Sequence, residues 1–199
     1  MVLRLMGPML PSGTDSAWIL ACWRFVTTSS VRPASVDDAS TVARLQLAVW
    51  RQSFASVLPA EAVNTDPTAH SASWANRIEW GGPVLLALEG TEPVGFAAAT
   101  SEPDRRNLLE TLGEIEVLHV VPRWARRGHG GRLLVATAAE LRRLGARTGR
   151  WWVPQVDTAT ARFLTAAGWA EDGVRRELDT GAAPIVELRW SGTLDLVAI

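Results

Sequence analysis

Apolar residues recur along the chain with two periods, and these periods predict alternating strands and helices. Apolar runs bounded by glycine, proline or polar residues predict strands at 31–35, 84–90, 93–101, 114–121, 150–154, 174–179 and 185–190. Helical spacing predicts helices at 37–57, 71–80, 131–145 and 158–169. In the first helix the recurring residues are Val42, Leu45, Val49 and Phe54. The order β-α-α-β-β-β-α-β-α-β-β predicts an α/β protein with a mixed sheet covered by helices on both faces.

The first thirty residues differ from the rest, because Pro8, Pro11 and nearby glycines interrupt their apolar runs. We expect 1–30 to be a poorly ordered extension and 31–199 to be one domain. The alternative is a short helix at 16–25 that packs on the domain or on a partner. The apolar run 17–23 is far shorter than the roughly 20 residues that span a bilayer, and it lacks the layout of a signal peptide. We therefore expect no membrane association.

Composition narrows the chemistry further. The chain has 199 residues, with 20 basic and 21 acidic side chains and a net charge of -1, which argues against a nucleic-acid partner. It has no lysine and no tyrosine, so a lysine Schiff base and a tyrosine general acid are excluded. Cys22 is the single cysteine, which rules out an internal disulfide and fits the cytoplasm. The three histidines show no metal-ligand spacing, so we expect no metal.

The segment "VVPRWARRGHGGRLL" (120–134) places glycines and arginines at a strand-to-helix corner. Glycines at such a corner let a ligand approach the first helical amides, which lack partners and favour phosphate. These glycines are Gly128, Gly130 and Gly131, and the arginines that could add charged hydrogen bonds are Arg126, Arg127 and Arg132. Leu133 stands where the dinucleotide motif needs its third glycine. A tight turn with solvated arginines remains the alternative on these residues alone.

The longer stretch "LHVVPRWARRGHGGRLL" resembles the acyl-CoA signature of the GNAT superfamily of N-acetyltransferases. The matching residues are Leu118, Val120, Pro122, Gly128, Gly130, Leu133 and Leu134. Ala125 departs from the pattern, which usually has Gln or Arg there. Downstream, "DTATARFLTAAGW" matches the family at Phe163, Gly168 and Trp169, whereas Asp157, Thr160 and Leu164 replace Asn, Ala and Tyr. The resemblance covers about 31–190.

The resemblance implies a mixed, mostly antiparallel central sheet that is splayed at the cofactor site. It also implies acetyl-CoA as co-substrate, with the pantetheine arm along 118–120 and the pyrophosphate on the amides of 126–131. A backbone N–H near Val120 would polarise the thioester carbonyl. The implied coenzyme-binding residues are Leu118, His119, Val120, Arg126, Arg127, Gly128, His129, Gly130, Gly131, Arg132, Asp157 and Phe163.

In the family an amine attacks the thioester directly in a ternary complex, so the amine must first lose a proton. Glu114 is our first candidate for the general base, and Glu116 is the second because a regular strand points both to the same side. Glu114 could equally be an exposed carboxylate at the end of the strand. His119 would point the other way and serve a structural role. Leu164 cannot protonate the leaving thiolate, so we expect unassisted departure, help from water, or reduced activity.

The acceptor pocket of such enzymes lies between the first helices and the last strands. Trp50, Trp74, Trp80 and Trp190 come from those segments and could either bind a cation or pack in the core. We expect an N-acetyltransferase that acts on a primary amine of a small molecule or peptide. The alternatives are a catalytically weak acyl-CoA-binding protein with a regulatory role and, last, a nucleic-acid binder. The sequence names neither the acceptor nor the oligomeric state, and the final strand pair leaves a homodimer open.

Overall fold

The computed structural model describes residues 29–55, 58–104, 110–179 and 184–196. The strands are β1 (Ser29–Pro33), β2 (Val84–Glu89), β3 (Glu92–Pro103), β4 (Thr111–Val120), β5 (Ala146–Pro154), β6 (Ala170–Leu178) and β7 (Ile185–Thr193). The helices are η2 (Val36–Asp38), α2 (Ala39–Val49), η3 (Trp50–Phe54), α3 (Ala60–Val63), α4 (Pro67–Trp80), η4 (Pro122–Trp124), α5 (His129–Arg143) and α6 (Thr158–Ala166).

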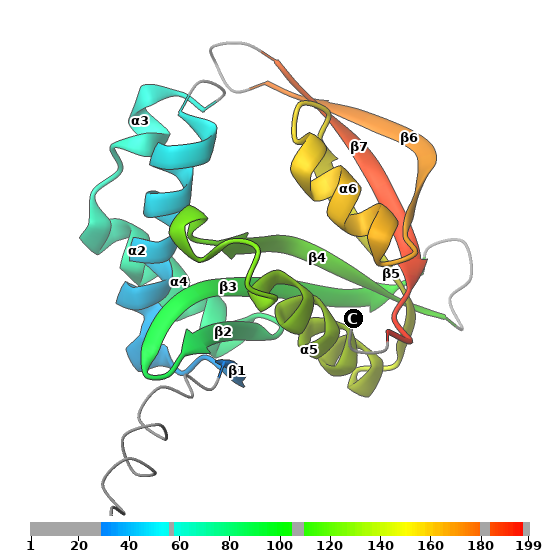
Figure 1. The fold of residues 1–199 in the computed structure, drawn as a ribbon, viewed down its shortest axis with the longest axis horizontal. Coiled ribbons are helices and arrows are strands. Elements are labelled where there is room, and N and C mark those ends of the chain that lie inside the picture. The colour runs from blue at the N-terminus through cyan, green and yellow to red at the C-terminus, as the bar shows by residue number, and fades with distance from the viewer. Residues whose placement is uncertain (1–28, 56–57, 105–109, 180–183, 197–199) are drawn as a thin grey trace, which may run out of the picture.

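The strands form one sheet of seven, in the order β1-β2-β3-β4-β5-β7-β6 (Figure 1). Its pairs are antiparallel except β4–β5, which are parallel and joined through the crossover helix α5. This parallel ladder runs only from Thr111 opposite Ala146 to Ile115 opposite Trp151. Beyond it β5 stays with β7, so the last five residues of β4 have no partner in β5. The expected mixed, mostly antiparallel and splayed sheet is therefore present.

Helices cover both faces of the sheet. On one face, α2 and α4 bury Val42 and Trp74 against Leu86 and Phe96 of the strands. On the other face, α5 packs Leu133 against β2 and β3, and α6 packs its fully buried Leu164 near β5. Apolar side chains thus pack on both sides of the sheet beneath these helices.

The structure corrects several predicted boundaries. α4 begins at Pro67 rather than residue 71, because proline needs no N–H in the first helical turn and the Asp66 carboxylate accepts a hydrogen bond from Thr68 N at 3.0 Å. β5 begins at Ala146 rather than residue 150 and β4 at Thr111 rather than 114, because the parallel ladder extends both strands. β1 includes residues 29 and 30, which we assigned to the extension; the rest of that extension lies outside the described residues.

A β-bulge corrects the expected directions of the side chains on β4. Ala98 pairs with Val117 and Ala99 with Ile115, so Glu116 is the extra residue. The extra residue shifts the alternation by one position along the rest of the strand. His119 consequently lies on the same face as Glu114, against Phe96, and the prediction that it points the other way is wrong.

Candidate active site

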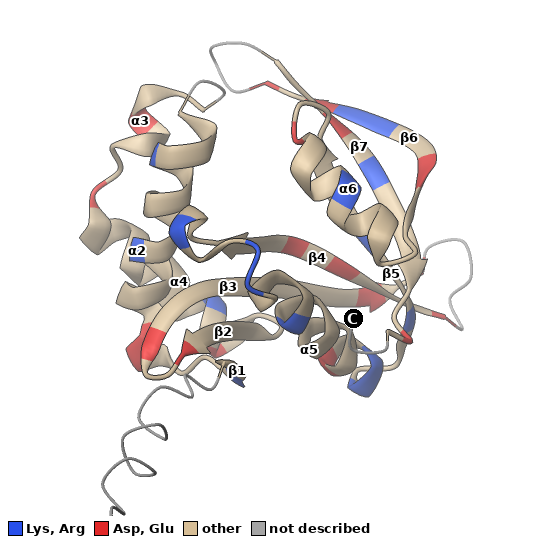
Figure 2. Cartoon of the chain, viewed as in Figure 1, with Lys and Arg blue, Asp and Glu red and all other residues tan. Residues whose placement is uncertain are grey.

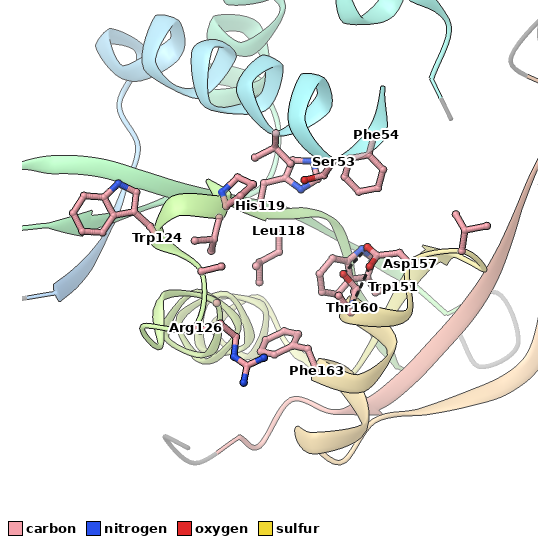
Figure 3. Close-up of a pocket in the computed structure, with 17 residues that line it drawn as sticks. Ser53, Phe54, Leu118, His119, Trp124, Arg126, Trp151, Asp157, Thr160 and Phe163 are labelled. Atoms are coloured by element: carbon pink, nitrogen blue, oxygen red, sulfur yellow. Dashed lines mark hydrogen bonds between the residues drawn. The ribbon is translucent and has the colours of Figure 1, made fainter. Parts of the chain in front are cut away.

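A cavity of about 480 Å³ opens where β4 and β5 separate (Figure 3). The end of β4 forms its floor, the loop before α5 one wall and the first turns of α6 the other. We call it the coenzyme cavity. Its lining residues are Val49, Ser53, Phe54, Leu118, His119, Val120, Pro122, Trp124, Ala125, Arg126, Gly130, Trp151, Val156, Asp157, Ala159, Thr160 and Phe163.

The loop between β4 and α5 is shaped by two left-handed residues. Gly128 is the N-cap of α5 with φ of 81°, and Arg126 has φ of 64°, which is uncommon for a residue with a side chain. Left-handed residues in a tight turn make neighbouring amides converge, as in anion-binding loops. Within the described parts of the chain, no protein group accepts a hydrogen bond from the amides of residues 126–131. Arg132 N, one residue further on, is the first that bonds within the turn, to Gly128 O at 3.1 Å. The loop therefore presents unpaired donors beside the cavity.

The structure divides the expected coenzyme-binding residues into two groups. Those that line the coenzyme cavity are Leu118, His119, Val120, Arg126, Gly130, Asp157 and Phe163, and those that do not are Arg127, Gly128, His129, Gly131 and Arg132. Two of the second group are engaged elsewhere: the Arg127 guanidinium lies over the ring of Trp124 at 4.7 Å, and Arg132 donates to Arg127 O at 3.1 Å. Basic residues follow one another along this loop, and acidic residues lie along β4 (Figure 2).

The His129 side chain points away from the cavity, into the protein. It is 1% exposed, contacts the Trp124 ring edge-on, and places Nε2 at 3.2 Å from Glu89 Oε2. Burial lowers the pKa of His129 despite that carboxylate. The side chain therefore cannot contact a ligand in the cavity, and its backbone N–H is the group that faces the loop.

The backbone of β4 also supplies a donor at the gap. Val121 N donates to Val94 O of β3 at 2.9 Å. Because successive residues of a strand turn their N–H groups to opposite edges, the Val120 N–H is directed to the edge that β5 has left. This is the position in which the resemblance places the donor to a thioester carbonyl.

A second cavity of about 250 Å³ lies on the other side of the gap, and we call it the acceptor cavity. Its lining residues are Gln46, Trp50, Phe54, Leu58, Glu116, Val117, Leu118, His119, Trp151, Trp152, Val153, Pro154, Asp157, Thr160, Leu178, Ile185 and Glu187. The two cavities share Phe54, Leu118, His119, Trp151, Asp157 and Thr160. These shared residues mark a junction where a group in one cavity meets a group in the other.

Three carboxylates line the acceptor cavity, and each has a different environment. Glu116 accepts a hydrogen bond from Arg77 Nη2 at 2.6 Å, and Glu187 accepts one from Arg176 Nε at 2.6 Å. Asp157 instead caps α6, accepting from Thr160 N at 3.0 Å and from Thr160 Oγ1 at 2.7 Å. Its partners are neutral, so its negative charge is not matched by an ion pair with any described residue.

His119 lies at the junction with its ring between Phe54 and Phe96, whose centroids are 5.8 Å and 5.7 Å away. Burial lowers the pKa of His119 to about 4. The imidazole is therefore neutral at physiological pH and adds no positive charge to the cavity.

The expected general base Glu114 lines neither cavity. It is bonded to Arg150 Nε at 2.5 Å, and Arg150 also bonds Glu102, in a polar groove on the uncovered face of the sheet. The second candidate, Glu116, does line the acceptor cavity, because the bulge displaces it toward α4. The structure thus separates the two glutamates that a regular strand would have kept together.

The four tryptophans that were candidates for the acceptor pocket lie in different environments. Trp50 lines the acceptor cavity, Trp74 and Trp190 are core residues, and Trp80 is 81% exposed. We missed Trp151 and Trp152, which also line the acceptor cavity. Leu164, which replaces the family tyrosine, is fully buried in the core and lines neither cavity.

A π-turn carries two further lining residues that we missed. η3 continues α2 as a π-helix and brings Ser53 and Phe54 to the gap. The sequence carried a signal for it, because Val49 and Phe54 are five residues apart, the interval that one π-turn places on the same face.

Comparison with known proteins agrees with this geometry. An uncapped loop at a helix N-terminus beside a splayed sheet suits a ligand that carries phosphate groups. The family model described as acetyltransferase (GNAT) family matches residues 47–169, more than half of the sequence, and the chain belongs to that family. No curated protein matches the chain.

Solved structures share the fold at low identity. yncA from Salmonella typhimurium, with its cofactor acetyl-CoA, is 18% identical over 86% of this chain and 97% of its own, with a TM-score of 0.64. The paia N-acetyltransferase from Thermoplasma acidophilum, in complex with coenzyme A, is 13% identical over 83% and 99%, with a TM-score of 0.64. A ribosomal-protein-alanine N-acetyltransferase from Brucella melitensis is 17% identical over 82% and 99%, with a TM-score of 0.64.

No helix among the described residues is long and apolar enough to cross a membrane. No cluster of three or more His, Cys, Asp or Glu side chains among them could hold a metal ion.

Proposed function

We propose that the chain transfers an acetyl group from acetyl-CoA to a primary amine of a small molecule or peptide. The observation that carries this proposal is the junction: a cavity beside unpaired backbone donors meets a second, acidic and aromatic cavity through the gap between β4 and β5. A transferase needs this layout, because the two reactants must enter from different sides and meet at one point.

The residues of the coenzyme cavity fit acetyl-CoA. The amides of 126–131 and the guanidinium of Arg126 would hold the pyrophosphate, and the open edge of β4 at 118–120 would hold the pantetheine arm. When bound, acetyl-CoA supplies an acetyl thioester that an amine can attack. The Val120 N–H would hydrogen-bond the carbonyl oxygen and stabilise the charge that develops there.

Removal of the proton from the amine is assigned to Glu116. A free alkylammonium has a pKa of roughly 10, so a base must help at neutral pH. Glu116 lines the acceptor cavity, and two hydrogen bonds from Arg77 hold its carboxylate in place. Glu114 is a poorer choice, because it is held by Arg150 outside both cavities. The thiolate leaves without an acid from the protein at this position, because Leu164 has no proton to donate and is buried. Water can protonate the thiolate, or it can leave unprotonated.

The second candidate is a catalytically weak acyl-CoA-binding protein with a regulatory role. Two observations favour it: Ala125 leaves one coenzyme contact of the family unfilled, and Leu164 offers no acid. A protein of this kind would bind acyl-CoA in the coenzyme cavity but would transfer the acyl group slowly.

Titration with acetyl-CoA, followed by thiol release over a panel of amines, tests the proposal. We expect tight binding and thiol release matched by acetylated amine in the mass spectrum. Binding without thiol release for any amine would favour the second candidate, and absence of binding would remove both.

The assignment of the base is tested by a matched pair of variants. Glu116→Gln should lower kcat on the order of 100-fold and flatten the acid limb of the pH–rate profile. Glu114→Gln keeps the same change of charge but lies outside both cavities, so its profile should follow the wild type. The reverse result would restore Glu114 as the base.

A further inference from the structure

The walls of the acceptor cavity are mostly aromatic and aliphatic. Trp50, Phe54, Trp151 and Trp152 contribute rings, and Ile185 adds an aliphatic side chain. The cavity volume is about 250 Å³, which suits a compact group rather than a long polar chain. Apolar walls favour the transfer of an apolar group from water, by roughly 25 cal/mol for each Å² that they cover.

The cavity has acidic side chains but no free cation. No arginine lines it within the described ranges, and the nearby Arg77 and Arg176 are already bonded to Glu116 and Glu187. His119 is neutral, because burial lowers its pKa to about 4. The neighbouring sequence segments 56–57 and 180–183 contain no basic residue. A carboxylate on the acceptor would therefore lose its hydration and gain no counter-charge.

Asp157 is the carboxylate placed where the two reactants would meet, because it lines both cavities. Glu116 and Glu187 line only the acceptor cavity. Figure 3 shows it at the junction beside Trp151, bonded to Thr160. An ionised carboxylate can accept about four hydrogen bonds, and the structure gives this one two. It retains the capacity and the charge to hold an ammonium group.

We infer that the acceptor is a compact, apolar primary amine without a carboxylate, and that Asp157 binds its ammonium group at the junction. The inference rests on the proposed function, whose acceptor class it specifies. Asp157 orients the nitrogen toward the coenzyme cavity, the aromatic walls enclose the apolar group, and Glu116 takes the proton. The family pattern has asparagine at this position, so the charge is a property of this chain.

A simpler role for Asp157 is to cap α6, and the test must separate the two. Asparagine caps a helix about as well as aspartate does, so Asp157→Asn keeps the cap and removes the charge. Asp66→Asn is the matched control, because Asp66 caps α4 through Thr68 N and lies outside both cavities.

Calorimetric titration of the full chain in the presence of coenzyme A measures acceptor binding without chemistry. The probes are 2-phenylethylamine, L-phenylalanine, which adds a carboxylate, and 2-phenylethanol, which removes the charge. We expect the amine to bind at least about tenfold more tightly than either of the others. Asp157→Asn should lower the affinity for the amine about tenfold and leave the melting temperature and the affinity for the alcohol unchanged. Asp66→Asn should change none of these affinities.

Equal binding of phenylalanine and phenylethylamine would overturn the inference, as would an unchanged affinity in Asp157→Asn or failure of the amine to bind. Repeating the titration with acetyl-CoA and measuring thiol release separates this inference from the proposed function. Amine binding that depends on Asp157 but gives no thiol release would disprove the transferase and keep the acceptor class. Thiol release at equal rates with phenylalanine and with phenylethylamine would keep the transferase and disprove the proposed acceptor class. In the active enzyme, Asp157→Asn should raise KM for the amine more than it lowers kcat.

Discussion

The coenzyme cavity and the acceptor cavity share the residues of one junction, yet they depend on different kinds of chemical group. The coenzyme cavity depends on backbone donors from one continuous stretch, the end of β4 and the loop into α5. The acceptor cavity depends on side chains from η3, β4, β5 and β7, which are distant in sequence. A backbone site constrains glycines and turn residues, whereas a side-chain site can vary residue by residue. The difference explains how one coenzyme can be kept while the acceptor is chosen separately.

The largest expected effect falls on the core between β5, β7 and Trp169, outside both cavities. Gly149 and Gly192 are paired on β5 and β7, and the buried Trp169 indole lies against both, so a Cβ on Gly192 would overlap the ring. Gly192→Ala should lower the free energy of unfolding by about 3 kcal/mol, as overpacking does, measured by urea denaturation. Gly131→Ala is the control, because a Cβ there meets nothing within 4 Å. Equal stability of the two variants would show that the indole can move.

A smaller effect is expected on coenzyme affinity, from a substitution in the loop before α5. Gly131→Asp places a negative charge beside the expected pyrophosphate, in a position open to a side chain. Repulsion of several kcal/mol between like charges predicts about 100-fold weaker binding of acetyl-CoA, measured by calorimetry. The fold should tolerate the change, since acidic residues suit the first turn of a helix. Gly131→Asn controls for size, and if it weakens binding as much, the loop does not hold the diphosphate.

Acidification should lower the free energy of unfolding through His119, which lies at the junction. The pKa of His119 falls from about 6.5 in the unfolded chain to about 4 in the folded one because of burial. Between these values the unfolded chain binds more protons, so stability is lost as pH falls from 6.5 toward 4. Relative to His119→Phe, the wild type should lose about 2 kcal/mol between pH 7 and pH 5, measured by urea denaturation at each pH. Parallel pH curves for the two proteins would contradict this.

The smallest expected effect restores a coenzyme contact. Ala125 lines the coenzyme cavity where the family usually has glutamine or arginine. Ala125→Gln should add one hydrogen bond and lower the dissociation constant for acetyl-CoA about threefold, with no effect on acceptor binding. Ala125→Leu provides side-chain size without the polar group. The assignment of the loop would be weakened if leucine gave the same gain.

Much of the fold could be predicted from sequence, because local patterns determine its elements. The chain order of strands and helices and the turn at Gly128 follow from such patterns, whereas the splayed sheet was implied by the resemblance to the family. The family model confirms the resemblance of the stretch from β4 to α6.

The acceptor side could not be predicted because tertiary contacts determine it. The bulge at Glu116 depends on how β3 pairs with β4, and no local pattern revealed it. It moved Glu116 into the acceptor cavity and turned His119 to the opposite face. Asp157 was chosen as a coenzyme residue from the family frame, and its position in both cavities appears only when α6 packs beside the gap. The assignment of Glu114 or Glu116 as base stays a prediction until the variants are measured.

The short parallel ladder between β4 and β5 has a consequence for motion. Only Thr111–Ile115 joins the two halves of the sheet there, so the free end of β4 exchanges its amide hydrogens with solvent more readily than the paired end. A molecule bound in the gap would contact both halves of the sheet and hold them together. Coenzyme binding should therefore slow deuterium uptake at 116–120 and at 151–154 together, and the two halves should separate more often when no coenzyme is bound.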